Sequence, residues 1–101
     1  MTPTQLSLRK LRADGYLCVV VEHWNAFARK RQDLFGFDII AVTDDGVLLV
    51  QTTSAANVSA RIHKIEDLPS TARLRKAGAR MVVHGWRKVG NRWQVREVDI
   101  S

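Results

Sequence analysis

The chain has little cysteine, little proline and no long apolar run. Its one cysteine, Cys18, excludes an internal disulfide, and the apolar residues around it predict a buried structural thiol. No stretch of about 18 apolar residues is present, so we expect no membrane span. The segment from Met1 to Arg12 is polar and basic and lacks the apolar core of a signal peptide. These features predict a cytoplasmic protein, and 101 residues predict one domain over 1–101.

Acidic residues are also scarce. Ten Asp and Glu stand against 16 Lys and Arg, which gives a net charge of +6 and a pI near 10.3. A short chain with this charge favours a polyanionic partner, and nucleic acid is the first choice. The three histidines lack metal-ligand spacing, and no Walker loop, Gly-x-Gly-x-x-Gly or Ser-His-Asp pattern is present. Structural zinc, nucleotide hydrolysis and dinucleotide redox chemistry therefore have no support.

The pattern of apolar residues, turns and caps predicts an α/β fold, with a mixed central β-sheet and flanking helices. A strand–helix–strand crossover, through the helices that follow the third strand, implies the mixed sheet. The first strand, Tyr16–Val21, is a continuous apolar run, which is typical of a strand covered on both faces. The predicted elements are a helix over Thr4–Ala13, strands over Tyr16–Val21, Phe37–Val42 and Val47–Thr53, a loop over His23–Gly36, a helix from Asn57 to Ile65, a short helix from Ser70 or Thr71 to Lys76, and strands over Arg80–Trp86 and Trp93–Ile100.

The most informative segment is the central pair of strands. Thr43 to Gly46 reads as a tight turn between two apolar runs, which predicts an antiparallel hairpin. Asp38 opens the first run, and the polar trio Gln51 to Thr53 ends the second. In a hairpin of this length both lie at the same open end. An acid beside polar side chains at that end predicts a divalent-metal site.

This layout resembles the core of the PD-(D/E)xK nuclease superfamily, in particular its Holliday-junction-resolvase-like branch. There an Asp near a strand start is followed on the next strand by Glu-x-Lys. The order helix, three strands, helix or helix pair, two strands also matches, so the resemblance covers nearly the whole chain. It implies a restriction-endonuclease or resolvase-like core and a metal-dependent DNA endonuclease using Mg²⁺ or Mn²⁺. A resolvase-like role further implies a homodimer, because two strands are cut symmetrically.

The family motif is altered in this chain. Asp38 takes the Asp position, Gln51 stands where the Glu would be, and Thr53 where the Lys would be. Gln51 can offer Mg²⁺ only a neutral carbonyl oxygen, and Thr53 cannot replace an ammonium. We expect Glu22 to supply the missing carboxylate, and Lys64 or Arg61 the missing cation. The alternative is a catalytically degenerate nuclease fold that acts as a DNA-binding or assembly module. A third, weaker reading is a protein-interaction domain with incidental charge.

Each candidate residue also has a structural interpretation. Asp38 can be a strand-edge acid satisfied by backbone N–H groups, and Glu22 can pair with Arg29 or Arg31. Gln51 and Thr53 can be polar caps at a strand end. Asp33 lies upstream of Gly36, in the predicted loop, and is the second choice for the metal acid.

Basic residues alternate with aromatic ones in the loop. Arg29, Lys30 and Arg31 lie between Phe27 and Phe35, and we expect them to contact phosphates together with Arg61 and Lys64. Trp24 and Phe27 are available for stacking on bases, but packing into the core is the favoured interpretation. We expect Trp86 and Trp93 to pair across the last hairpin, and His63 is a minor candidate for a general base.

Overall fold

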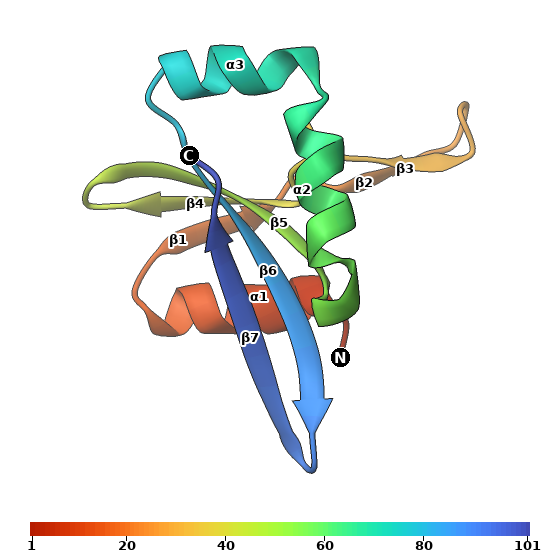
Figure 1. Ribbon diagram of the computed structural model, residues 1–101, viewed down its shortest axis with the longest axis vertical. Helices are drawn as coiled ribbons and strands as arrows, with labels where there is room; N and C mark the ends of the chain where they lie inside the picture. Colours follow the sequence, from red (N-terminus) through yellow and green to blue (C-terminus); the bar gives the residue numbers. More distant parts are fainter.

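The mixed α/β fold predicted from the sequence is confirmed by the computed structural model, which describes residues 1–101 and contains a five-stranded sheet and three helices (Figure 1). None of the helices is long and apolar enough to cross a membrane. The elements are α1 (Pro3–Ala13), β1 (Leu17–Val20), β2 (His23–Asn25), β3 (Lys30–Gln32), β4 (Ile39–Thr43), β5 (Gly46–Ser54), the 3-10 turn η1 (Ala55–Asn57), α2 (Val58–Glu66), α3 (Pro69–Lys76), β6 (Arg80–Val89) and β7 (Arg92–Asp99).

The central sheet has the strand order β1-β4-β5-β6-β7. The predicted β4–β5 hairpin is antiparallel, with Thr43 opposite Gly46 at the turn and Ile39 opposite Val50 near the open end. The chain then crosses over through α2 and α3 and returns as β6, which pairs with β5 in parallel. The last hairpin is longer than predicted, and Gly90-Asn91 forms its turn as expected.

Neighbouring residues of the strands point to opposite faces of the sheet, and each face carries its own core. Leu48 and Val50 belong to a cluster that includes Leu11 of α1. Leu49, between them, belongs to a second cluster that includes Val58 and Ile65 of α2. The sheet is therefore the middle layer, with α1 on one face and α2 on the other.

Helix boundaries differ from the sequence predictions by a few residues. Thr2, and not Thr4, caps α1 through a reciprocal pair of hydrogen bonds with Gln5. Asn57 precedes α2 as predicted, although its side chain makes no capping hydrogen bond. Neither Ser70 nor Thr71 caps α3, because the helix begins at Pro69 and both residues lie within its first turn. The Thr71 hydroxyl instead donates to the carbonyl of Ile65 at the end of α2.

The prediction that the first strand is covered on both faces is wrong. β1 is an edge strand that pairs only with β4. Its side chains Leu17 and Val19 are 74% and 55% exposed, and Cys18 is half-buried. An apolar run shows that a strand can be buried, but the position of the strand in the sheet decides whether it is.

The predicted loop His23–Gly36 contains a second, two-stranded sheet formed by β2 and β3. This ribbon projects from the body of the molecule (Figure 1), and we call residues 23–32 the arm. The favoured prediction that its aromatic side chains pack into the core is wrong. Trp24 is 60% exposed and Phe27 is fully exposed.

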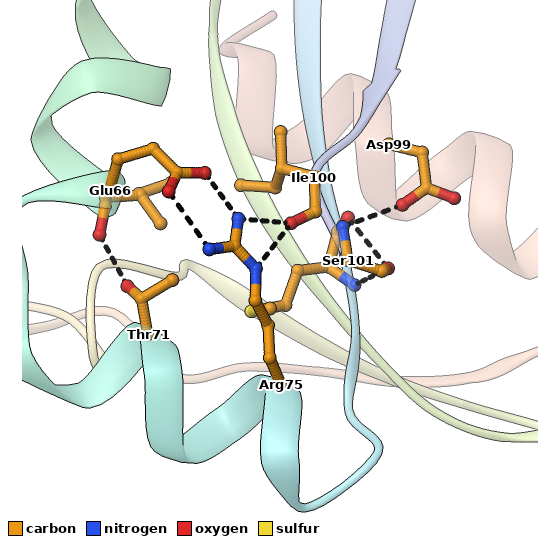
Figure 2. Close-up of polar contacts among 8 residues, drawn as sticks. Glu66, Thr71, Arg75, Asp99, Ile100 and Ser101 are labelled. Carbon is orange, nitrogen blue, oxygen red and sulfur yellow. Dashed lines mark hydrogen bonds and ion pairs between the residues drawn. The ribbon is translucent and has the colours of Figure 1, made fainter.

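The last strand and the residues after it are fixed by α3 and β6. The Arg75 guanidinium donates to the carbonyl of Ile100 and to the carboxylate of Glu66, and Ser101 accepts a hydrogen bond from the backbone N–H of Met81 (Figure 2).

The predicted pairing of the two tryptophans in the β6–β7 hairpin is also wrong. Trp86 lies opposite Val95, whereas Trp93 lies opposite Lys88, whose ammonium sits over its ring.

Candidate functional site

A polar cleft of about 510 Å³ lies at the open end of the β4–β5 hairpin, where Asp38 precedes β4 and where β5 ends. It collects residues from four parts of the chain, the first being Pro3 and Thr4 at the start of α1. Asp38, Gln51, Thr52 and Thr53 come from the hairpin, Glu22, Arg31, Gln32 and Asp33 from the two ends of the arm, and Arg61 and Lys64 from α2. All five residues predicted from the sequence to carry catalysis therefore line one cleft.

Asp38 is held firmly by one of its two oxygens. Its Oδ2 accepts hydrogen bonds from Gln51 Nε2 (2.9 Å), from the backbone N–H of Thr52 (2.9 Å) and from the Thr52 hydroxyl (3.1 Å). The side-by-side placement of Asp38 and Gln51 predicted from the hairpin is confirmed. Oδ1 accepts no hydrogen bond from the protein, and no buried polar side-chain atom of the chain lacks a partner. Oδ1 is therefore open to the cleft.

The pKa of Asp38 is raised to about 6, chiefly by burial; the hydrogen bonds from Thr52 act against this rise, and the hydrogen bond and negative charge of the neighbouring Glu22 carboxyl add to it. Two carboxyl groups thus share one end of the cleft. Their mutual repulsion is relieved either by a shared proton or by a cation. This is the electrostatic environment that a divalent metal ion needs.

Glu22 also makes the ion pair that its structural interpretation predicted. Arg31 Nη1 donates to Glu22 Oε1 at 2.9 Å. The Arg31 side chain is 72% exposed. The Glu22 side chain is 19% exposed, but the guanidinium is open to solvent, which screens the pair, so the pair contributes on the order of 1 kcal/mol. Arg31 can therefore leave Glu22 at little cost when another cation or a phosphate arrives.

The Gln51 side chain donates hydrogen bonds within the protein through its amide nitrogen, and its amide oxygen has no hydrogen-bond partner in the protein. Nε2 donates to Asp38 and to the carbonyl of Thr52 (3.0 Å), which fixes the orientation of the amide. Oε1 accepts no hydrogen bond from the protein. Thr53 lines the cleft with a hydroxyl, so no ammonium comes from this strand.

Thr52 is the site residue that sequence reasoning missed. Besides its two bonds to Asp38, its hydroxyl lies 2.8 Å from the hydroxyl of Thr4 on α1. Thr52 therefore orients the acid and ties the site to the first helix. A signal existed in the polar trio, because the backbone N–H that follows Gln51 is the one closest to the acid across the hairpin.

The cations are divided between the cleft and the arm. Arg61 and Lys64 line the cleft from α2, and neither forms an ion pair with a carboxylate. Arg29 and Lys30 lie on the arm, outside the cleft and exposed. His63 is exposed and does not line the cleft, so its candidacy as a general base is not supported. Asp33 lines the cleft but accepts the Gly36 N–H at 3.0 Å.

The donor set suits magnesium better than zinc. The chain holds no group of three or more His, Cys, Asp and Glu residues that could bind a metal ion by themselves. Mg²⁺ is commonly bound by one or two carboxylates together with waters and substrate phosphates. Asp38 and Glu22 with the amide oxygen of Gln51 fit that requirement.

A Ser-His-Glu constellation also exists, away from the cleft. Ser7 Oγ lies 2.9 Å from His84 Nδ1, and Glu97 Oε1 lies 3.2 Å from His84 Nε2. Ser7 and His84 are completely buried, and Trp86 Nε1 donates to Ser7 Oγ at 2.8 Å. No substrate can reach this hydroxyl, so the network joins α1 to β6 and does not catalyse.

The chain matches no protein-family model, no curated protein and no solved structure.

Proposed function

We propose that this protein is a metal-dependent DNA endonuclease with a resolvase-like core and an altered PD-(D/E)xK motif. One observation carries the proposal. Asp38 and Glu22 bring two carboxyl groups together in a polar cleft, and the unpaired cations Arg61 and Lys64 form another part of its lining. Carboxylates beside free cations form the arrangement that binds a metal ion and a phosphodiester at the same time. The mixed sheet and the element order agree with this proposal.

Each residue has a definite role in the proposal. Asp38 Oδ1, Glu22 and the Gln51 amide oxygen would hold the metal, and Thr52 keeps Asp38 in position. Bound Mg²⁺ would supply charge neutralisation at the phosphate and lower the pKa of a water molecule. Lys64 or Arg61 takes the place of the family's lysine by binding the phosphate from α2. Symmetric cleavage of two strands further calls for a homodimer.

A second function is favoured by a specific observation. Thr53 brings no ammonium to the hairpin. The Glu22 carboxylate already forms an ion pair with Arg31, and the Gln51 amide donates its N–H group to Asp38. These contacts give Glu22 and one oxygen of Asp38 partners without a metal ion. A DNA-binding or assembly module that retains the fold and the basic surface is therefore the alternative.

A cleavage assay separates the two functions. The protein is incubated with duplex, single-stranded and four-way-junction DNA, in Mg²⁺, in Mn²⁺ and in chelator. We expect metal-dependent cleavage by the parent, none by Asp38→Asn, and unimpaired DNA binding by that variant, because the basic surface is intact. Asp33→Asn is the matched control and should cleave.

Two outcomes would contradict this assignment. Binding without cleavage of any DNA form supports the binding module instead. Cleavage that persists in Asp38→Asn, and is lost in Asp33→Asn, moves the site to Asp33 and Glu22.

The motif itself can be tested by restoring it. Gln51→Glu alone places a further negative charge beside Asp38, whereas the added Thr53→Lys supplies a compensating cation at the same strand end. We expect the double variant to cleave faster than the parent. A folded double variant that cleaves no faster shows that the altered motif does not limit the rate.

A further inference from the structure

The arm is attached to the molecule at the cleft. Glu22 precedes β2, Gln32 ends β3, and both line the cavity. Trp24 is opposite Arg31 in the register, so the two side chains share one face of the ribbon. Arg31 reaches Glu22 from that face. The exposed ring of Trp24 is thus on the same face of the arm as Arg31, which lines the cleft.

The tip of the arm displays Phe27 in a fixed turn. Asn25 Oδ1 accepts the backbone N–H groups of Phe27 and Ala28, each at 3.0 Å. Arg29 completes the turn in the left-handed conformation, with φ of 51°. Since Ala26 and Ala28 flank Phe27, no large neighbour shields the ring. The ring is fully exposed.

The amino-acid composition of the arm indicates which class of partner it binds. Residues 23–32 contain three cations, no acid and no aliphatic side chain larger than alanine. The charge favours a polyanion. Flat rings with small neighbours suit stacking on bases, whereas insertion into a lipid surface draws on bulky aliphatic side chains as well. Trp24 and Phe27 are three residues apart, which spans at most about 10 Å, or about three base steps.

We propose that the arm is a base-stacking probe that recognises DNA at a branch or strand discontinuity. Phe27 stacks on an unpaired or splayed base, Trp24 contacts the strand between that base and the cleft, and Arg29 and Lys30 bind the flanking phosphates. Perfect duplex offers no free base face to Phe27, so this contact distinguishes branched DNA from plain duplex. The proposal rests on the proposed function, because it concerns the DNA that the cleft receives.

Binding and base unstacking together test the probe. Affinities are measured for duplex and for four-way-junction DNA with 2-aminopurine at the branch, whose fluorescence rises on unstacking. Chelator is present so that no strand is cut. We expect Phe27→Ala to bind the junction about 5- to 150-fold more weakly, the effect of losing one base–aromatic stack. The fluorescence rise should disappear, and the affinity for duplex should be unchanged.

Matched variants separate the ring from general damage. Phe27→Tyr keeps a stacking ring and should retain both junction affinity and the fluorescence rise. Trp93→Ala removes an exposed aromatic from the far hairpin and should behave like the parent.

The inference is overturned if Phe27→Ala binds and unstacks the junction like the parent. In that case the proposed function of the cleft still stands, because cleavage does not depend on this result. It is also overturned if the substitution instead abolishes self-association or binding to anionic vesicles. If the parent binds no DNA form, the proposed function fails together with the probe.

Discussion

Replacing Asp38 with Asn should stabilise the protein above pH 6. Asn is nearly the same size as Asp, and its Oδ1 can accept the hydrogen bonds that Oδ2 of Asp38 accepts from Gln51 and Thr52. Its Nδ2 can donate to Glu22, where Asp38 presents a second negative charge. The substitution therefore keeps the hydrogen bonds and removes a buried like-charge contact.

The magnitude follows from the raised pKa. Asp38 moves from 3.8 to about 6 on folding, so the folded state holds its proton more tightly than the unfolded chain does. Stability from this group is complete below pH ~4 and is lost as the pH rises to about 6. A shift of this size corresponds to about 3 kcal/mol. Water in the open cleft screens part of the charge, so we expect Asp38→Asn to raise the free energy of unfolding by about 1 to 3 kcal/mol above pH 6.

Urea unfolding of the parent and of Asp38→Asn between pH 4 and pH 8 measures the effect, without added metal. The difference between the two should grow from near zero at pH 4 to a plateau above pH 6. Asp45→Asn, which removes an exposed acid from the turn at the opposite end of the hairpin, should change stability by less than about 0.5 kcal/mol. A difference for Asp38→Asn that does not vary with pH would refute the reasoning.

Two further predictions concern the arm and the sheet. Replacing Arg29, Lys30 and Arg31 together with Ala should weaken binding to all DNA sequences alike and lower the slope of log affinity against log salt by about 2 to 3, in a titration from 50 to 200 mM salt; unchanged binding would show that the arm is not the footprint. Gly85→Ala would place a Cβ 2.2 Å from Val58 Cγ2 and should lower the free energy of unfolding by about 1 to 3 kcal/mol, measured in urea; a variant as stable as the parent would mean that α2 can move off the sheet.

The hairpin that carries the site could be predicted because its determinants are local. The turn at Thr43–Gly46 and two apolar runs of matched length set the register, and the register places Asp38 beside Gln51. The convergence of Arg61 and Lys64 on the same end followed from α2, which comes one short turn after β5. These predictions needed only short-range geometry.

The errors came from contacts that the local pattern does not contain. The run around Val19 is as apolar as a central strand, but no other strand pairs with the outer side of β1. The arm lacks alternation of apolar and polar residues, because the ribbon packs against no core and is held by backbone hydrogen bonds and by the turn at Asn25. An aromatic residue such as Phe27 is usually buried, so its exposure could be seen only in the structure.

The buried contacts of Ser7 with His84 and Trp86 have a consequence for the order of folding. They join residues 77 and 79 positions apart, whereas Asp38 and Gln51 are 13 positions apart. During synthesis the hairpin can pair while most of the crossover and β6 are still missing. The first helix has no partner for its buried hydroxyl until β6 emerges. Because Thr4 of that helix bonds Thr52, the final alignment of the site waits for nearly the whole chain.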